Sequence, residues 1–155
     1  MKALCAALCL LGCAHAGGGL QSADGKSFEL KQVAGKVVLL DFWATWCQPC
    51  KATLPATQRI ADKLGPRGFA AYVVNVEKQS IEVGLFLKEL KVSLPVLRDP
   101  GGVQAEAMGG ANLPFAVLID RQGAVRFKQE GAPDGVEEIL TTEAEKLLAE
   151  PPPAK

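Results

Sequence analysis

Hydrophobic residues recur along the chain at two spacings, one typical of strands and one typical of helices. Three uninterrupted β-prone runs predict buried strands, at residues 37–42, 69–76 and 115–120. After the first run, small and apolar residues recur every four positions and predict a helix: Ala52, Ala56, Ile60 and Leu64. The pattern therefore predicts a strand, a helix and a strand in succession, followed later by a third buried strand.

Shorter patterns complete the prediction. Brief strands are predicted at residues 28–30, 94–97 and 124–128, the second at an edge of the sheet and the last in a hairpin with the strand before it. Helices are predicted at residues 83–90 and 103–108. A last helix is predicted to start near Asp134, with Glu137 placed as in a capping box. The expected fold class is α/β, a central mixed sheet flanked by helices.

The N-terminal residues have the form of an export signal. Met1 and Lys2 supply a short positive segment, and residues 3–11 form an apolar stretch. Two cleavage sites compete, one after Ala16 and a lipobox-like one before Cys13, which would leave that cysteine as a lipidated N-terminus. An apolar N-terminus that is never cleaved is the remaining alternative. We expect an exported, periplasmic protein, held to a membrane by lipid if cleavage precedes Cys13.

These features divide the chain into four parts. We expect a signal at residues 1–16, a flexible spacer at 17–27, one domain at 28–149 and a proline-rich tail at 150–155. The 17 basic and 17 acidic residues balance, which argues against binding of nucleic acid or of an anionic membrane. No apolar run reaches the roughly 20 residues of a membrane-spanning helix, so membrane contact is expected only through Cys13.

The positions of the cysteines predict redox chemistry. Cys5, Cys9 and Cys13 lie in the signal or at its end, so the domain itself contains only Cys47 and Cys50. A structural disulfide framework joins distant positions, whereas these two residues are three apart. They follow a buried strand and open a helix, where free N–H groups and the helix dipole favour a thiolate at Cys47. We expect Cys47 to attack a substrate disulfide and Cys50 to resolve the mixed disulfide.

The segment FWATWCQPC, residues 42–50, resembles the active-site loop of the thioredoxin superfamily, in particular its TlpA/ResA-like branch of exported bacterial oxidoreductases. Pro55 matches the proline that kinks the following helix in that family, and Leu113-Pro114 matches its cis-proline loop. The resemblance extends over about residues 28–149. It implies a thioredoxin fold with an N-terminal extension and a central βα insert.

The resemblance also implies roles for single residues. Cys47 and Cys50 would form the catalytic pair, with no cofactor apart from their redox-active disulfide and no metal. Gln48 and Pro49 would form the active-site loop between them. Substrate would dock on three residues: Trp46, Leu113 and Pro114. Trp43 is expected to pack in the core beneath the loop.

The implied partners are protein disulfide substrates and an upstream dithiol donor, expected to be membrane-bound. Pro49, as the second residue of the dipeptide, resembles the reducing members of the superfamily, and the neutral Gln48 adds no charge. We therefore expect a reductase of exported proteins. Cytochrome c maturation is one job that the branch suggests.

The sequence departs from the branch at three positions. Many members have a glutamate three residues after the second cysteine, where this chain has Thr53. Asp41 lies in a buried strand, where burial should raise the pKa of a carboxyl, and we expect it to act as acid and base toward Cys50. The alternative is a partly solvated aspartate near the end of the strand. Phe115 replaces the threonine that is common after the cis-proline.

Three other functions were weighed. A metal-binding or metal-delivery module of the same fold could use the two cysteines, but the only histidine, His15, lies in the signal. A thiol peroxidase needs a threonine and an arginine around its cysteine, and only Thr45 lies close by in sequence. A docking module with an inactive site does not explain an intact cysteine pair beside Trp46, Pro49 and Pro114.

Overall fold

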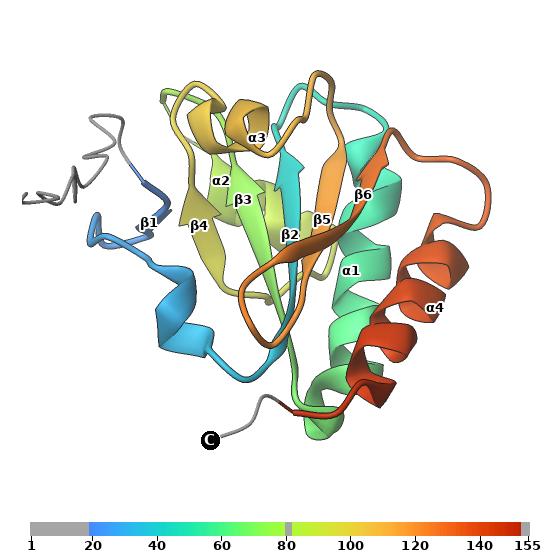
Figure 1. Ribbon diagram of the computed structural model, residues 1–155. Coiled ribbons are helices and arrows are strands. Elements are labelled where there is room, and N and C mark those ends of the chain that lie inside the picture. The colour runs from blue at the N-terminus through green and yellow to red at the C-terminus, as the bar shows by residue number, and fades with distance from the viewer. Residues whose placement is uncertain (1–18, 80–81, 153–155) are drawn as a thin grey trace, which may run out of the picture.

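The computed structural model describes residues 19–79 and 82–152, in which six strands form one mixed sheet between helices (Figure 1). The strands are β1 (Gln21–Ser22), β2 (Val37–Trp43), β3 (Phe69–Asn75), β4 (Val96–Arg98), β5 (Phe115–Ile119) and β6 (Val125–Glu130). Their order across the sheet is β1-β4-β3-β2-β5-β6. The α/β prediction, with its flanked mixed sheet, is confirmed.

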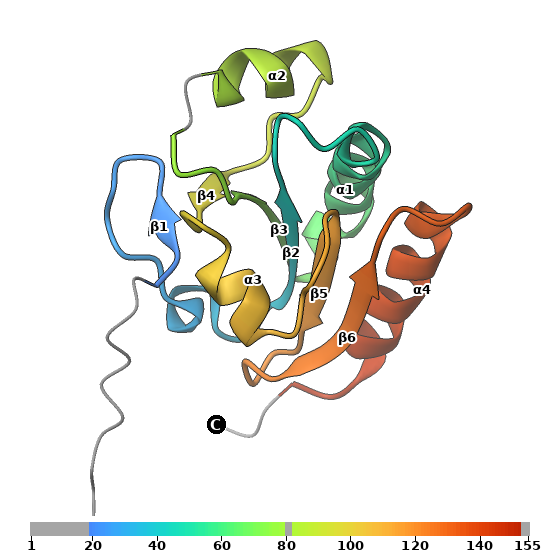
Figure 2. The ribbon, with the colours of Figure 1, turned by 90° about the horizontal axis from the view of Figure 1, so that it is seen from above.

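Helices cover both faces of the sheet. The α-helices are α1 (Cys50–Leu64), α2 (Val83–Glu89), α3 (Val103–Ala107) and α4 (Val136–Ala149). Two short 3₁₀ helices are η1 (Leu30–Val33) and η2 (Gly65–Arg67). Viewed from above, α1 and α4 lie together against one face of the sheet, while α3 lies against the other (Figure 2). Within the described ranges, no helix is long and apolar enough to cross a membrane.

The side chains of β2 point alternately to the two faces of the sheet and so contribute to two separate layers of the core. Val37 and Leu39 belong to a cluster with residues of α1 and α4, whereas Val38, Leu40 and Phe42 belong to the cluster on the α3 side. Because side chains alternate along a strand, Asp41 points to the same side as Val37 and Leu39. Its carboxyl group therefore faces α1.

The register of β2 sets the geometry of its carboxyl end. Val37–Trp43 pairs in parallel with all of β3, and Phe42 pairs with Phe115 on the antiparallel β5. β2 therefore ends where β5 begins. The loop that follows Trp43 is brought beside the segment that precedes Phe115, and this segment contains Leu113 and Pro114.

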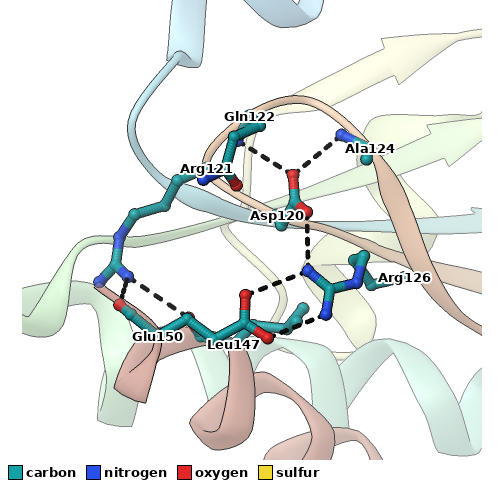
Figure 3. Close-up of polar contacts among 7 residues, drawn as sticks. All are labelled: Asp120, Arg121, Gln122, Ala124, Arg126, Leu147 and Glu150. Atoms are coloured by element: carbon teal, nitrogen blue, oxygen red, sulfur yellow. Dashed lines mark hydrogen bonds and ion pairs between the residues drawn. The ribbon is translucent and has the colours of Figure 1, made fainter. Parts of the chain in front are cut away.

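The opposite end of the sheet is closed by a polar clasp (Figure 3). Asp120 follows β5 and accepts hydrogen bonds from the backbone N–H groups of Gln122 and Ala124 and from the Arg126 guanidinium. Arg126 also forms two hydrogen bonds with the Glu150 carboxylate, and Arg121 donates to the carbonyls of Leu147, Leu148 and Glu150. The clasp ties the β5–β6 turn to the last turn of α4.

Three local predictions differ from the structure. The spacer predicted at residues 17–27 contains a strand instead, since Gln21 and Ser22 pair with β4 and Leu20 is buried. β1, and not β4, is therefore the edge of the sheet. The strand predicted at residues 28–30 is absent from the described fold, because Phe28 turns inward against Tyr72 and η1 begins at Leu30.

The start of the last helix also differs. Gly135, with a φ of 75°, takes the N-cap position of α4, and no side chain caps this end. The Glu137 carboxylate forms an ion pair with Arg59 on α1 instead, with 2.6 Å between its oxygen and a guanidinium nitrogen. The predicted capping box is therefore wrong. The Glu137 carboxylate, which would have accepted a backbone N–H at the start of the helix, binds a residue distant in sequence.

Candidate active site around Cys47 and Cys50

The two cysteines lie at the junction of β2 and α1, joined by a disulfide. Cys47 follows the strand, and its backbone N–H donates to the Ala44 carbonyl at 3.1 Å. The helix begins at Cys50, after a turn in which the N–H of Cys50 donates to the carbonyl of Cys47 at 3.2 Å. Cys47 is 4% exposed and Cys50 is fully buried, so only the first sulfur lies near the surface. The order of attack expected from the sequence, with Cys47 first and Cys50 second, stays a prediction.

The dipeptide between the cysteines is open to solvent. Gln48 and Pro49 are exposed, and Pro49 is the N-cap of α1 with a helical φ of −63°. The fixed φ of proline suits this position, where its missing N–H leaves no hydrogen bond unmade. Pro55 lies within α1, as expected.

Trp46 and Leu113 face a groove beside the cysteine pair. The groove has a volume of about 400 Å³, and its other walls include Ala105, Asn112 and Phe115. Trp46 is 66% exposed, the most exposed large apolar side chain in the described chain. Leu113 is half-buried and packs against the cluster that contains both cysteines. The Leu113–Pro114 bond is cis, which confirms the sequence prediction, and Pro114 is buried.

Trp43 lies beneath the loop, as predicted. Its side chain is fully buried in the same cluster as Cys47 and Cys50. The ring of Phe86, from α2, stacks on it with centroids 5.2 Å apart, and Lys51 lies 5.8 Å from the Phe86 centroid. This stacking packs α2, the helix that follows β3, against the residue that leads into the active-site loop.

Glu77 anchors the active-site loop, and its importance was missed at the sequence level. One carboxylate oxygen accepts the backbone N–H of Thr45 at 2.9 Å, and the other accepts the Thr45 hydroxyl at 2.8 Å. The Asn75 amide donates to the same carboxylate at 2.9 Å. Burial alone would raise the pKa of Glu77, but the hydrogen bonds from Asn75 and Thr45 lower it below its usual range. A charged Glu77 is therefore hydrogen-bonded to Thr45, which precedes Cys47 by two positions in the chain.

A sequence signal for Glu77 did exist. Asn75 and Glu77 are polar residues at the carboxyl end of a buried strand, next to the strand that leads to Cys47. Polar groups in such a place need partners, and a partner on the neighbouring loop is the nearest choice.

Asp41 is fully buried, which excludes the partly solvated alternative. Its Oδ2 accepts a hydrogen bond from the Thr57 hydroxyl at 2.9 Å, and its Oδ1 has no partner in the described chain. Burial raises the pKa of Asp41 to about 7, against the opposite effect of the Thr57 hydrogen bond and, to a smaller extent, of the Thr53 hydroxyl. The direction of this shift confirms the expectation from the sequence. A carboxyl of this kind can gain or lose a proton near neutral pH.

Thr53 occupies the position of the glutamate common in the branch. It is 3% exposed, and its hydroxyl donates to the Cys50 carbonyl at 3.4 Å, a long hydrogen bond. No group of three potential metal ligands lies together in residues 19–79 and 82–152. The structure thus adds no support for the metal-binding alternative. The candidate anchor Cys13 lies outside the described residues.

Comparison with known proteins agrees with this geometry. The Redoxin family model matches residues 15–145. The thiol-disulfide oxidoreductase ResA of Bacillus thuringiensis is 34% identical over 119 residues, which cover 76% of this chain and 69% of the relative. ResA of Bacillus subtilis is 35% identical over 106 residues, covering 68% of this chain and 59% of the relative.

Solved structures show the same fold. A DsbE-type thiol:disulfide interchange protein from Chlorobium tepidum superposes with a TM-score of 0.76 at 30% identity, covering 84% of this chain and 92% of the other. The exposed lipoprotein thioredoxin Etrx1 of Streptococcus pneumoniae has a TM-score of 0.65 at 29% identity, covering 83% and 97%. The chain therefore belongs to the Redoxin family, within the TlpA/ResA-like thiol–disulfide oxidoreductases of the thioredoxin superfamily.

Proposed function

We propose that this thiol–disulfide oxidoreductase works as a reductase of disulfides in exported proteins. The observation that carries the direction of electron flow is the charge of Glu77, which is hydrogen-bonded to Thr45, two positions before Cys47 in the chain. A negative charge near Cys47 disfavours its thiolate, and a less stable reduced form gives a more reducing couple.

The proposed reaction is a balanced thiol–disulfide exchange. The Cys47 thiolate attacks one sulfur of the client disulfide, and the other client sulfur leaves as a thiolate that takes up a proton. Cys50 then loses its proton and attacks Cys47, which breaks the bond to the client and closes the Cys47–Cys50 disulfide. Two electrons pass from the enzyme to the client. An upstream dithiol donor, expected to be membrane-bound, must return them.

Asp41 is proposed to take the proton of Cys50. Its burial keeps a proton exchangeable near neutral pH, as a general base requires. Thr53 contacts the same region, since its hydroxyl donates to the Cys50 carbonyl and it lowers the pKa of Asp41 to a smaller extent than Thr57 does. Asp41 would supply the proton acceptor that the buried Cys50 thiol needs in order to ionise.

Client docking is proposed along the groove between Trp46 and Leu113. An exposed tryptophan supplies apolar contact area at little cost in conformational entropy, and the half-buried Leu113 leads to the cysteine cluster. Pro114, without an N–H of its own, lies buried between Leu113 and Phe115, two residues that line this groove. An extended client segment that contains a cysteine fits such a surface.

Export is proposed from the apolar N-terminal signal, with lipidation at Cys13 as one of its two outcomes. A structural relative, Etrx1, is described as an exposed lipoprotein thioredoxin. Among clients, an apocytochrome c is the one that the branch suggests, and other exported proteins remain equal candidates.

A redox titration of the Cys47–Cys50 couple against glutathione tests the proposed direction. We expect a potential closer to the roughly −270 mV of thioredoxin than to the roughly −120 mV of DsbA. The same protein should precipitate insulin in the presence of a dithiol, whereas Cys47→Ser should not. A potential above about −150 mV would overturn the assignment as a reductase. Cys50→Ser should hold clients covalently on Cys47, so their identity can be read by mass spectrometry.

A further inference from the structure

Asp41 has an unusual set of neighbours for a buried carboxyl. Its partners across the sheet are Val73 on β3 and Ala116 on β5, both apolar. From α1, the polar side chains that act on it are Thr57 and Thr53, both buried and one turn apart. No titratable or charged side chain of the described residues forms a hydrogen bond or ion pair with Asp41.

This environment lacks the fixed positive charge that would hold Asp41 ionised. Hydroxyl groups have a different property, since each can donate to a carboxylate or accept from a carboxylic acid after a rotation of its hydrogen. Thr57, at 2.9 Å, can therefore stay hydrogen-bonded to Asp41 in both protonation states. The cost of an unpaired buried group is avoided whether or not the proton is present.

The two hydroxyls also limit how far burial raises the pKa of Asp41. Burial is the largest influence on its pKa, and it acts upward, while Thr57 and then Thr53 act downward. Each hydroxyl that favours the charged carboxylate over the neutral acid lowers the pKa. Without them, Asp41 would keep its proton through neutral pH and could not accept another.

We propose that Thr57, supported by Thr53, is the positioning residue that determines the pH at which Asp41 can accept the proton of Cys50. This inference rests on the proposed role of Asp41 and adds the residues that regulate it. The step that it governs is the second one, in which Cys50 attacks Cys47, the client thiolate leaves and the proton of Cys50 passes to Asp41. The substrate groove does not take part.

The matched variants are Thr57→Val, which keeps the shape of the side chain but removes the hydroxyl, and Thr57→Ser, which keeps the hydroxyl. A mixed disulfide between Cys47 and a labelled client peptide is mixed rapidly with buffers between pH 5 and pH 9, and release of the peptide is followed. For the wild type, we expect release to accelerate with a midpoint near pH 7. Thr57→Val should move the midpoint upward by about one pH unit, a loss of about five-fold at pH 7. Thr57→Ser should restore the wild-type profile.

The variant Asp41→Asn distinguishes the role of Thr57 from the acid–base role of Asp41 itself. If it removes this pH dependence while Thr57→Val leaves the midpoint in place, the role of Thr57 is wrong and that of Asp41 stands. If Asp41→Asn leaves the profile unchanged, the acid–base role of Asp41 itself fails. The carbonyl absorption of protonated Asp41 in the infrared, identified by its loss in Asp41→Asn, gives a direct titration.

A second variant guards against loss of folding. Should circular dichroism show that Thr57→Val is unfolded, Thr53→Val tests the same hydroxyl pair with a smaller upward shift expected. A Thr53→Val profile that coincides with the wild type would then contradict the inference.

Discussion

The Glu77 carboxylate accepts both the backbone N–H and the side-chain hydroxyl of Thr45, although the two residues are 32 positions apart. This pair of bonds joins the ends of β3 and β2 just before the cysteine loop. It has two separable consequences, one for the position of the loop and one for the charge beside Cys47.

Replacing Glu77 with glutamine should raise the reduction potential of the cysteine pair, because the variant removes the charge but keeps the shape of the side chain. Glu77→Ala should raise it as well and should also lower the free energy of unfolding by about 1–3 kcal/mol, since it leaves Thr45 and Asn75 unpaired. Glutathione titration and urea denaturation measure the two effects. Glu138→Gln, an exposed change on α4, is the control and should alter neither. An unchanged potential in Glu77→Gln would remove the electrostatic argument for a reductase.

The stability of the oxidised protein should fall as the pH rises from about 4 to 7. The pKa of Asp41 is raised to about 7 in the folded protein from 3.8, so in this window the folded state binds a proton that the unfolded state has lost. Stability therefore decreases with pH up to the folded pKa and is constant above it, as far as this residue contributes. Asp41→Asn should flatten the dependence and should be more stable than the wild type at pH 8. Urea denaturation at pH 5 and pH 8 checks this, and parallel curves for the two proteins would contradict it.

Gly110→Ala should perturb the groove wall. A Cβ at this position would meet the Phe115 ring at 2.4 Å, closer than any real contact allows, so the ring must move. We expect a loss of about 1–3 kcal/mol in stability, as for other overpacked sites, together with a higher KM for a client peptide. Gly84→Ala is the matched control, because a Cβ there meets nothing within 4 Å. Equal behaviour of the two variants would show that the wall tolerates the displacement.

Arg121→Ala should destabilise the domain without changing its chemistry. The guanidinium donates to three carbonyls at the end of α4, where the last turn of a helix has no partners of its own (Figure 3). We expect the unfolding free energy to fall by about 1–3 kcal/mol while the reduction potential stays the same. Calorimetry and glutathione titration make the comparison. A shifted potential would mean that the clasp is coupled to the cysteines at the other end of the sheet.

Much of the site could be predicted from local sequence. Cys47 and Cys50 can be recognised because they lie between a predicted strand and a predicted helix. Asp41 can be recognised because it is the one charged residue in an apolar run. The cis bond before Pro114 was predicted from family resemblance alone. In each case, the informative residues lie within a few positions of one another.

The parts that could not be predicted depend on contacts between distant segments. Thr57 has no special place in the periodicity of α1, and its role becomes visible only when β2 packs against that helix. Glu137 has the right spacing to cap α4 but binds Arg59, 78 positions away. The sequence spacing indicates which hydrogen bonds are possible, but the packing of distant segments determines which of them form.

The place of β2 in the sheet has a consequence for the clients. Trp43, the last residue of β2, is fully buried, and the strand is bonded to a neighbour on each side. A loop that follows such a strand is fixed at its start, so we expect most of the motion during exchange to come from the client. Disulfides in unfolded chains should then be reduced faster than the same bonds inside folded proteins.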